Sequence, residues 1–326
     1  MRSMRELRCI RIHAMTTPKK TSARKAPPKK AAPSKAPIAK KMSPLDALER
    51  LASKRRPAPA KAVEVVPVPQ LSLDLWPNAK RGVPNAILRS ALFSVMKDRP
   101  AVTRELLAAV DNVKIIFTGI RLNQKDLDYF EELLHLQRMY PLGEEIRFTA
   151  SALLKTMGLS TGKAQYDELK DVMARLQANT TEVTVDNKKT FSRSLIEKAN
   201  RDEETQEYVV QLSPLLLRMF DDGYTQVDWT QRHSLGKNML AKALHGLYAT
   251  HAAPYPVKVD TIRRLTGSTT KDLSKFRQQL RAALTALQDV GALLKWEIDK
   301  RDLVHVQKLA SLSQQRHLLK KSLSLS

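Results

Sequence analysis

Hydrophobic residues recur at helical spacing in several segments of the chain from Pro84 onward. Apolar positions three to four residues apart predict helices over 87–96, 127–134, 151–157 and 166–176. Apolar or alternating stretches predict strands at 114–118, 146–148, 183–185, 191–195 and 208–212, the last three as an antiparallel sheet. Helix, strand, helix-turn-helix and hairpin is the order of a winged-helix domain.

The same order occurs a second time after Asp222-Gly223. Helices are predicted around 239–247, 260–265 and 269–287, with a turn at Gly267, an N-cap at Asp260 and a closing hairpin over 294–306. The two long helices share an aromatic, Leu, small apolar, Leu pattern, at Tyr166, Leu169, Met173, Leu176 and at Phe276, Leu280, Leu284, Leu287. We therefore predict an α+β protein with two tandem winged-helix domains; the alternative is one irregular α+β domain.

The composition changes sharply along the chain. Residues 1–65 form a Lys/Ala/Pro-rich arm, which we expect to be disordered because it has too few apolar residues to offset the ordering entropy. A linker follows at 66–83, the first winged helix at 84–222, a second, DNA-binding winged helix at 223–309, and a flexible tail at 310–326. Met42 offers an internal start.

Net charge points to a partner rich in phosphate. Residues 1–62 carry 18 Lys or Arg against three acids, which is +15 of the total +23, and the rest of the chain is moderately basic. A single cysteine, Cys9, excludes an internal disulfide and a multi-cysteine zinc site. No apolar run approaches about 20 residues, so we expect a soluble protein. We also expect it to be cytoplasmic, associated with nucleoid or plasmid, and to have no cofactor.

The helix predicted after Gly267 has a face suited to double-stranded DNA. At 100° per residue from the inward Phe276, the outward face carries no acid. It comprises Lys271, Ser274, Gln278, Arg281 and Thr285, flanked by Lys275 and Arg277. Arg281 suits guanine, Gln278 suits adenine, and the lysines suit phosphates. Lys300 and Arg301, at the predicted wing tip, are candidate phosphate ligands, and Asp272 sits where the partner in a capping box with Thr269 belongs.

The first long helix differs, because its outward face carries Asp167, Glu168 and Asp171. Acids facing phosphate weaken binding. We therefore expect this domain to contact DNA through the start of the helix and a loop, at Ser160, Thr161, Lys163, Lys188 and Lys189. The rest of its surface is then free to bind protein.

Enzyme functions fit poorly. The heptapeptide 158–164 resembles a phosphate-binding loop, but it has three residues rather than four between its glycines and lacks the Ser or Thr that would hold magnesium. The seven histidines form no His-x-His pair of the kind a metal-dependent nicking enzyme needs. A helix-turn-helix turn is the better interpretation of 158–164.

A short motif precedes the first domain. Gln70, Leu71, Leu73 and Leu75 resemble the Gln-Leu-x-Leu-x-Leu element by which replication proteins bind the bacterial sliding clamp, and either Leu75 or Trp76 would fill the terminal pocket. Alternating leucines suit an extended peptide in a groove. The alternative is an edge strand that packs Leu73, Leu75 and Trp76 on its own domain.

From this element through 77–85, 235–239 and the final hairpin, the chain resembles the TrfA family of plasmid replication initiators, over about residues 65–307. The resemblance implies binding to repeated origin sites (iterons), melting of adjacent AT-rich DNA with single-strand contacts, and recruitment of host DnaA, replicative helicase and sliding clamp. It also implies a homodimer off DNA and a monomer on DNA. A transcriptional repressor without a replication role is the alternative.

Overall fold

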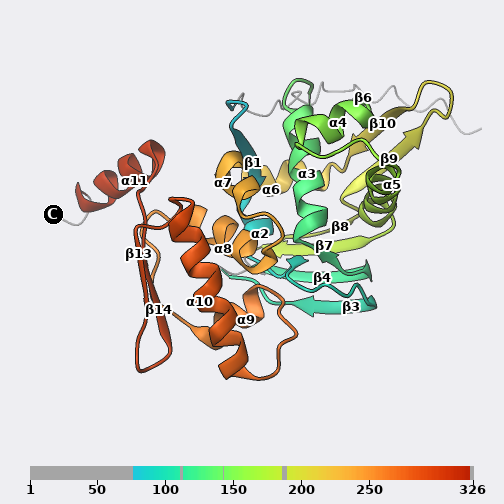
Figure 1. Cartoon of the computed structure of the whole chain (residues 1–326). Helices are drawn as coiled ribbons and strands as arrows, with labels where there is room; N and C mark the ends of the chain where they lie inside the picture. The colour runs from blue at the N-terminus through green and yellow to red at the C-terminus, as the bar shows by residue number, and fades with distance from the viewer. Residues whose placement is uncertain (1–75, 111–112, 142, 186–188, 324–326) are drawn as a thin grey trace, which may run out of the picture. The chain divides into compact units, whose positions relative to one another are not determined.

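The second of the two repeated units begins at helix α8 and forms a winged helix (Figure 1). In the computed structural model, which describes residues 76–110, 113–141, 143–185 and 189–323, its elements follow in winged-helix order. They are α8 (Met239–Ala249), β12 (Val257–Lys258), α9 (Val259–Leu265), α10 (Leu273–Asp289), β13 (Lys295–Ile298) and β14 (Leu303–Gln307). The strands form a sheet in the order β12-β14-β13, with Val304 opposite both Val257 and Ile298.

The first unit has the same topology. Its elements are α3 (Gln124–Gln137), β6 (Glu145–Thr149), α4 (Ala150–Thr156), α5 (Lys163–Gln177), β9 (Ile196–Arg201) and β10 (Glu207–Leu212). The sheet order β6-β10-β9 places the last strand in the middle, as in the second unit. The predicted α+β fold with tandem winged helices is therefore confirmed. The predicted arm over 1–65 lies outside the described residues.

Both helix-turn-helix turns contain a glycine in the left-handed region. Gly158 follows α4 with φ of 65°, and Gly267 follows α9 with φ of 63°. Side chains other than Asn and Asp rarely adopt this conformation, so glycine allows the sharp turn between the two helices. The stretch 158–164 thus forms the turn into α5 and its first residues, as the sequence indicates, and not a phosphate-binding loop after a strand.

A four-stranded antiparallel sheet accompanies the first unit, with two strands that precede α3 and two that lie between α5 and β9. It comprises β3 (Ala101–Leu107), β4 (Val113–Ile120), β7 (Thr180–Val185) and β8 (Lys189–Arg193), in that order. Ile115, Phe117 and Val183 of this sheet are buried in the first hydrophobic core. The predicted sheet of three strands from 183 to 212 is therefore wrong in detail, because β7 and β8 pair with β4, whereas β10 pairs with β6 and β9.

Two small strand pairs join distant parts of the chain. β1 (Lys80–Pro84) pairs antiparallel with β11 (Tyr224–Asp228), and β2 (Phe93–Ser94) pairs parallel with β5 (Leu122–Asn123). Three short helices lie beside them in the sequence: α2 (Asn85–Leu88), α6 (Leu215–Asp221) and α7 (Trp229–Ser234).

Three local predictions need correction. The helix predicted over 87–96 ends at Leu88, and the continuous apolar run 91–93 leads into a buried strand, which helical spacing alone does not distinguish from a helix. Asp260 lies in the first turn of α9, where it pairs with Arg263 and Arg264, and it is not the N-cap. A helix, α11 (Leu312–Leu323), occupies most of the predicted flexible tail.

Within the described part of the chain, no helix combines the length and the apolar character that crossing a membrane requires.

Candidate nucleic-acid interface

Helix α10 is fixed in place by its cap and by one apolar face. Asp272 is itself the N-cap, because its carboxylate accepts hydrogen bonds from the backbone N–H groups of Ser274 (2.8 Å) and Lys275 (3.3 Å). The predicted capping-box role with Thr269 is therefore wrong, since the helix begins four residues later. The inward face is as predicted, with Phe276, Leu280, Leu284 and Leu287 fully buried.

The opposite face of α10 is exposed and free of acids. Ser274, Lys275, Gln278 and Arg281 are exposed along it, and Lys271 is exposed just before the helix. The helix has no acidic residue until Asp289, its last position. The structure therefore brings together five of the predicted DNA-binding side chains on one cationic, hydrogen-bonding surface.

Arg277 does not belong to that free surface. Its guanidinium makes two hydrogen bonds to Asp302 in the hairpin turn, Nε to Oδ1 at 2.9 Å and Nη2 to Oδ2 at 2.6 Å. This bidentate pair engages two of the five N–H donors of the guanidinium within the protein. A direct contact from Arg277 to DNA stays a prediction.

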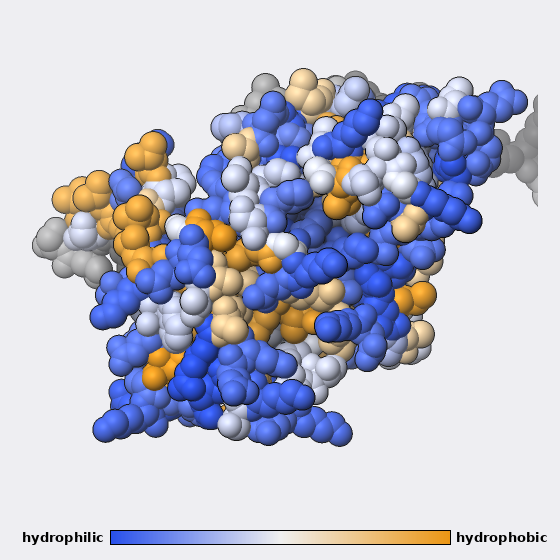
Figure 2. Space-filling view, viewed as in Figure 1, coloured by the Kyte–Doolittle hydropathy of each residue, from blue (hydrophilic) through white to orange (hydrophobic). Residues whose placement is uncertain are grey.

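The turn between β13 and β14 exposes positive charge. Lys300 and Arg301 are exposed at its tip, with 83% of the Arg301 side chain accessible. Figure 2 shows a hydrophilic surface over the lower part of the view, where this turn and the start of α10 lie in Figure 1.

The two acids of the turn are occupied. Asp299 accepts hydrogen bonds from the backbone N–H groups of Arg301 and Leu303 and contacts His305 Nε2 at 3.1 Å. The Leu303 N–H and the other contacts hold the pKa of Asp299 below its usual value, and the hydrogen bond from Arg277 does the same for Asp302. Asp299 and Asp302 thus stabilise the turn, while the basic side chains of Lys300 and Arg301 remain exposed.

The first winged helix presents a different surface. Ser160, Thr161 and Lys163 are exposed at the start of α5, as predicted, but Asp167 and Asp171 are exposed along the same helix. Glu168 forms ion pairs with Lys125 (2.9 Å) and with Arg175 (3.3 Å). Of the three predicted outward acids, two therefore face solvent.

The loop of the first domain that is predicted to contact DNA is not the wing of its winged helix. Lys189 is the first residue of β8, in the four-stranded sheet, and Lys188 lies outside the described residues. The turn equivalent to Lys300-Arg301 joins β9 to β10 and carries the exposed acids Asp202, Glu203 and Glu204. Strand β9 was not predicted because its polar sequence lacks a clear apolar alternation.

Trp76 is buried in its own domain. Its side chain is 3% exposed, and its indole Nε1 donates a hydrogen bond to His135 Nδ1 at 3.0 Å. Residues 70–75 of the clamp-like motif lie outside the described residues. Of the two candidates for a terminal clamp pocket, Trp76 is therefore corrected to a core residue, and Leu75 remains a prediction.

An ionic seam (Arg232, Asp128, Glu131 and Lys242) joins the two winged helices. Arg232 of α7 is 1% exposed and contacts Asp128 Oδ1 (2.9 Å) and Glu131 Oε2 (3.0 Å) of α3, while Lys242 of α8 reaches Asp128 Oδ2 at 2.7 Å. No local pattern in the sequence indicated these contacts, which span more than 100 positions.

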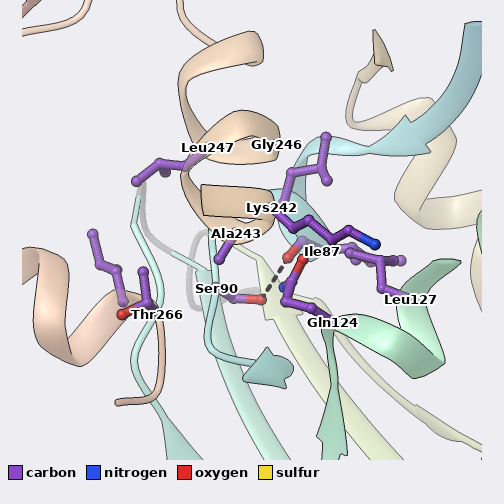
Figure 3. Close-up of a pocket in the computed structure, with 11 residues that line it drawn as sticks. Ile87, Ser90, Gln124, Leu127, Lys242, Ala243, Gly246, Leu247 and Thr266 are labelled. Atoms are coloured by element: carbon purple, nitrogen blue, oxygen red, sulfur yellow. Dashed lines mark hydrogen bonds between the residues drawn. The ribbon is translucent and has the colours of Figure 1, made fainter. Parts of the chain in front are cut away.

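Close packing continues beside the seam (Figure 3). Ile87, Gln124, Leu127, Lys242 and Gly246 line a crevice among α2, α3 and α8. A Cβ added at Gly246 would lie 2.8 Å from Leu88 Cδ2, so glycine permits α8 to approach α2 this closely. The helix against which α10 packs is thereby tied to the first winged helix.

Comparisons with known proteins give consistent matches. The family model described as "TrfA protein" matches residues 60–308. The plasmid replication initiator protein TrfA of Escherichia coli is 29% identical over 244 residues, which are 72% of this chain and 63% of that protein. The aligned part thus spans less than two thirds of this relative.

Among solved structures, domains 2 and 3 of RctB match with a TM-score of 0.47 and 10% identity over 70% of this chain and 99% of that one. The Pi initiator protein in complex with iteron DNA matches with a TM-score of 0.42 and 11% identity over 56% of this chain and 91% of that one.

Proposed function

Because the chain belongs to the TrfA protein family, we propose that it is a plasmid replication initiator that binds repeated sites, or iterons, in double-stranded origin DNA. The observation that carries this proposal is the acid-free outward face of α10 beside the exposed Lys300-Arg301 turn. In a winged helix this face is the one that enters the major groove, and the wing follows the backbone.

Each exposed side chain has a proposed role. Arg281 reads guanine through its two parallel N–H donors, and Gln278 reads adenine through its amide. Ser274, Lys271, Lys275, Lys300 and Arg301 bind phosphates and fix the register on the duplex. Ser160, Thr161 and Lys163 of the first winged helix add a smaller backbone contact.

Footprinting and affinity titration on origin DNA test this function. The full chain should protect repeated sites, and it should bind a duplex repeat at least about 1,000-fold more tightly than random duplex at one salt concentration. Equal affinity for the two duplexes would contradict sequence-specific origin binding. Specific binding at a promoter, with no effect on plasmid replication, would instead favour a repressor.

Recruitment of host factors is the second part of the proposal. We place the sliding-clamp contact at Gln70, Leu71, Leu73 and Leu75, and include DnaA, the replicative helicase and the melted AT-rich strand among the partners. We also propose that this chain is a homodimer off DNA and that it binds DNA as a monomer. The proposal contains no catalytic step, so supercoiled origin plasmid should acquire no nick.

A double substitution separates recruitment from DNA binding. Leu73→Ala with Leu75→Ala should leave iteron affinity unchanged and abolish plasmid replication, because only the apolar docking side chains are lost. Val66→Ala with Val68→Ala, just outside the motif, is the matched control. Replication at full copy number in the leucine variant would remove the clamp role while leaving origin binding intact.

A further inference from the structure

Asp302 links the wing turn to both helices of the second helix-turn-helix. Its carboxylate receives two hydrogen bonds from Arg277 of α10, and its backbone carbonyl accepts one from the N–H of Val259 (2.9 Å), where α9 begins. Its own N–H donates to the carbonyl of Asp299 at 3.1 Å, which closes the turn. One residue therefore connects the turn, α9 and α10.

The geometry at Asp302 is specialised for this connection. Its φ is 60°, in the left-handed region, which among residues with side chains Asp and Asn tolerate best. The turn residues Lys300 and Arg301 directly precede it. A change in the position of Asp302 would therefore displace the exposed basic residues Lys300 and Arg301 as well.

Arg277 is suited to hold such a connection. It lies on α10 between the buried Phe276 and the exposed Gln278, at the flank of the outward face. Its planar guanidinium forms two parallel bonds to one carboxylate, which fixes both distance and orientation, whereas an ammonium group fixes only distance.

We propose that the Arg277–Asp302 pair is a positioning device that holds the Lys300-Arg301 turn beside the outward face of α10, so that base reading and phosphate binding occur as one rigid contact. This inference rests on the proposed function and deepens it. It assigns Arg277 a role in DNA binding through the wing.

A simple electrostatic role predicts the opposite result. If Asp302 only offset nearby positive charge, its removal would free Arg277 and reduce repulsion of phosphate, so binding would tighten. If the pair positions the wing, removal of the carboxylate weakens binding although the protein becomes more positive. The sign of the change therefore separates the two roles.

Asp302→Asn is the main variant, because Asn tolerates the same backbone conformation and removes only the charge. We expect iteron affinity to fall about fivefold to tenfold. The slope of log affinity against log salt concentration should become shallower by the equivalent of about one to two phosphate contacts. Asp289→Asn removes an exposed acid at the far end of α10 and serves as the matched control, with affinity unchanged or slightly higher. Arg277→Lys, which keeps the charge but not the bidentate geometry, should behave like Asp302→Asn.

A double-substitution cycle with Arg301→Ala provides the decisive readout. Arg301→Ala should cost about fivefold in the wild-type background and less than about twofold in the Asp302→Asn background, because a displaced wing has already lost that contact. Thermal unfolding of each variant checks that the domain remains folded.

Either of two results overturns the proposal: Asp302→Asn binds as tightly as wild type with the same salt dependence, or Arg301→Ala costs the same in both backgrounds. Failure of the proposed function is distinguishable. A wild-type chain that did not prefer iterons to random duplex would refute origin recognition, whereas the same cycle on random duplex would still test the pair, because wing contacts to phosphate do not depend on sequence.

Discussion

Trp76 shows how one side chain separates a docking motif from the folded domain. The indole packs on Gly82 of β1, where an added Cβ would lie 2.6 to 2.8 Å from three ring carbons. Burial lowers the pKa of His135 to about 3, so the imidazole is neutral and its Nδ1 accepts the indole hydrogen bond. The clamp-like motif therefore ends directly before a fixed point of the fold.

Gly82→Ala should destabilise the protein by about 1 to 3 kcal/mol, because a rigid ring cannot yield to a new methyl group as a flexible side chain can. Denaturant unfolding measures the change. In a Trp76→Ala background the same substitution should cost almost nothing, since the ring that it contacts is gone. An equal cost in both backgrounds would mean that the strand, and not the indole, requires glycine at this position.

Arg281 and Lys300 have different predicted roles although both are exposed cations. Arg281→Ala should cost about 1 to 3 kcal/mol of binding free energy at an iteron and much less on random duplex, because it removes base readout. Lys300→Ala should weaken binding to both duplexes equally. It should also make the salt dependence of affinity shallower by the equivalent of about one phosphate contact.

Lys295→Ala, at the other end of β13, is the matched control for Lys300 and should leave the affinity for both duplexes unchanged. Affinity titrations over a range of salt concentrations check all three variants. Equal losses for Arg281→Ala on specific and random DNA would remove its base-reading role.

Among the helices, those with sustained apolar periodicity were predictable and those without it were not. The faces of α5 and α10 that the sequence placed inward are buried, because a long amphipathic helix repeats its signal over several turns. The polar strand β9 has no such signal, so the sequence indicates a DNA-contacting loop at Lys188-Lys189 and not the turn between β9 and β10. The pairing of β1 with β11 joins residues at least 140 positions apart and has no local signature.

The candidate interface was predictable to the same extent. Helical geometry gave the exposed face of α10, including Gln278 and Arg281, because the buried face defines its opposite. It could not show that Arg277 turns aside to Asp302, which lies 25 residues away across a hairpin. Flanking positions depend on tertiary contacts that spacing alone does not encode.

The two wings should respond unequally to a reversal of charge. Arg301→Glu should reduce iteron affinity more than about tenfold, because it places an acid at the phosphate backbone. Glu204→Lys, the matched reversal in the acidic turn of the first winged helix, should change affinity less than about twofold. Tighter binding of several-fold by Glu204→Lys would place the first wing against DNA and contradict the assigned asymmetry.

The ionic seam makes the two winged helices interdependent. Asp128 and Glu131 come from α3 of the first winged helix, and Lys242 comes from α8 of the second. Arg232 comes from α7, which directly precedes α8, so the acids of one winged helix face positive charges on and next to the other. Removing one partner of a buried ionic set costs about 3 to 5 kcal/mol because the remaining charges are left without compensation. The orientation of α8, and through it of α10, depends on this seam.

Glu131 gives the seam a dependence on pH that can be isolated. Burial raises its pKa from 4.5 to about 7, against the opposing effect of Arg232, while Asp128 raises it further and Lys242 and Arg81 lower it. Between these two values the unfolded chain has lost the proton and the folded chain keeps it. The contribution of Glu131 to the free energy of unfolding therefore falls as pH rises from about 4.5 to 7, and is constant above that.

Two buried histidines act in the opposite direction. Burial lowers the pKa of His135 and of His245 from 6.5 to about 3, so both stay neutral in the fold. Their contribution to stability is complete above pH 6.5 and is lost as pH falls toward 3. Wild-type stability in this range is therefore a balance between Glu131 and the histidines, and only a difference between variants reveals the glutamate.

Glu131→Gln removes the titration and keeps the shape of the side chain. Urea unfolding at pH 5, 6 and 7.5 should show the variant gaining stability relative to wild type as pH rises, by about 2 to 3 kcal/mol over the range, given about 1.4 kcal/mol for each unit of pKa difference. Parallel pH profiles for the two proteins would mean that Arg232 holds Glu131 ionised at pH 5. The seam would then be a fixed ion pair, and the joint between the winged helices would be insensitive to pH.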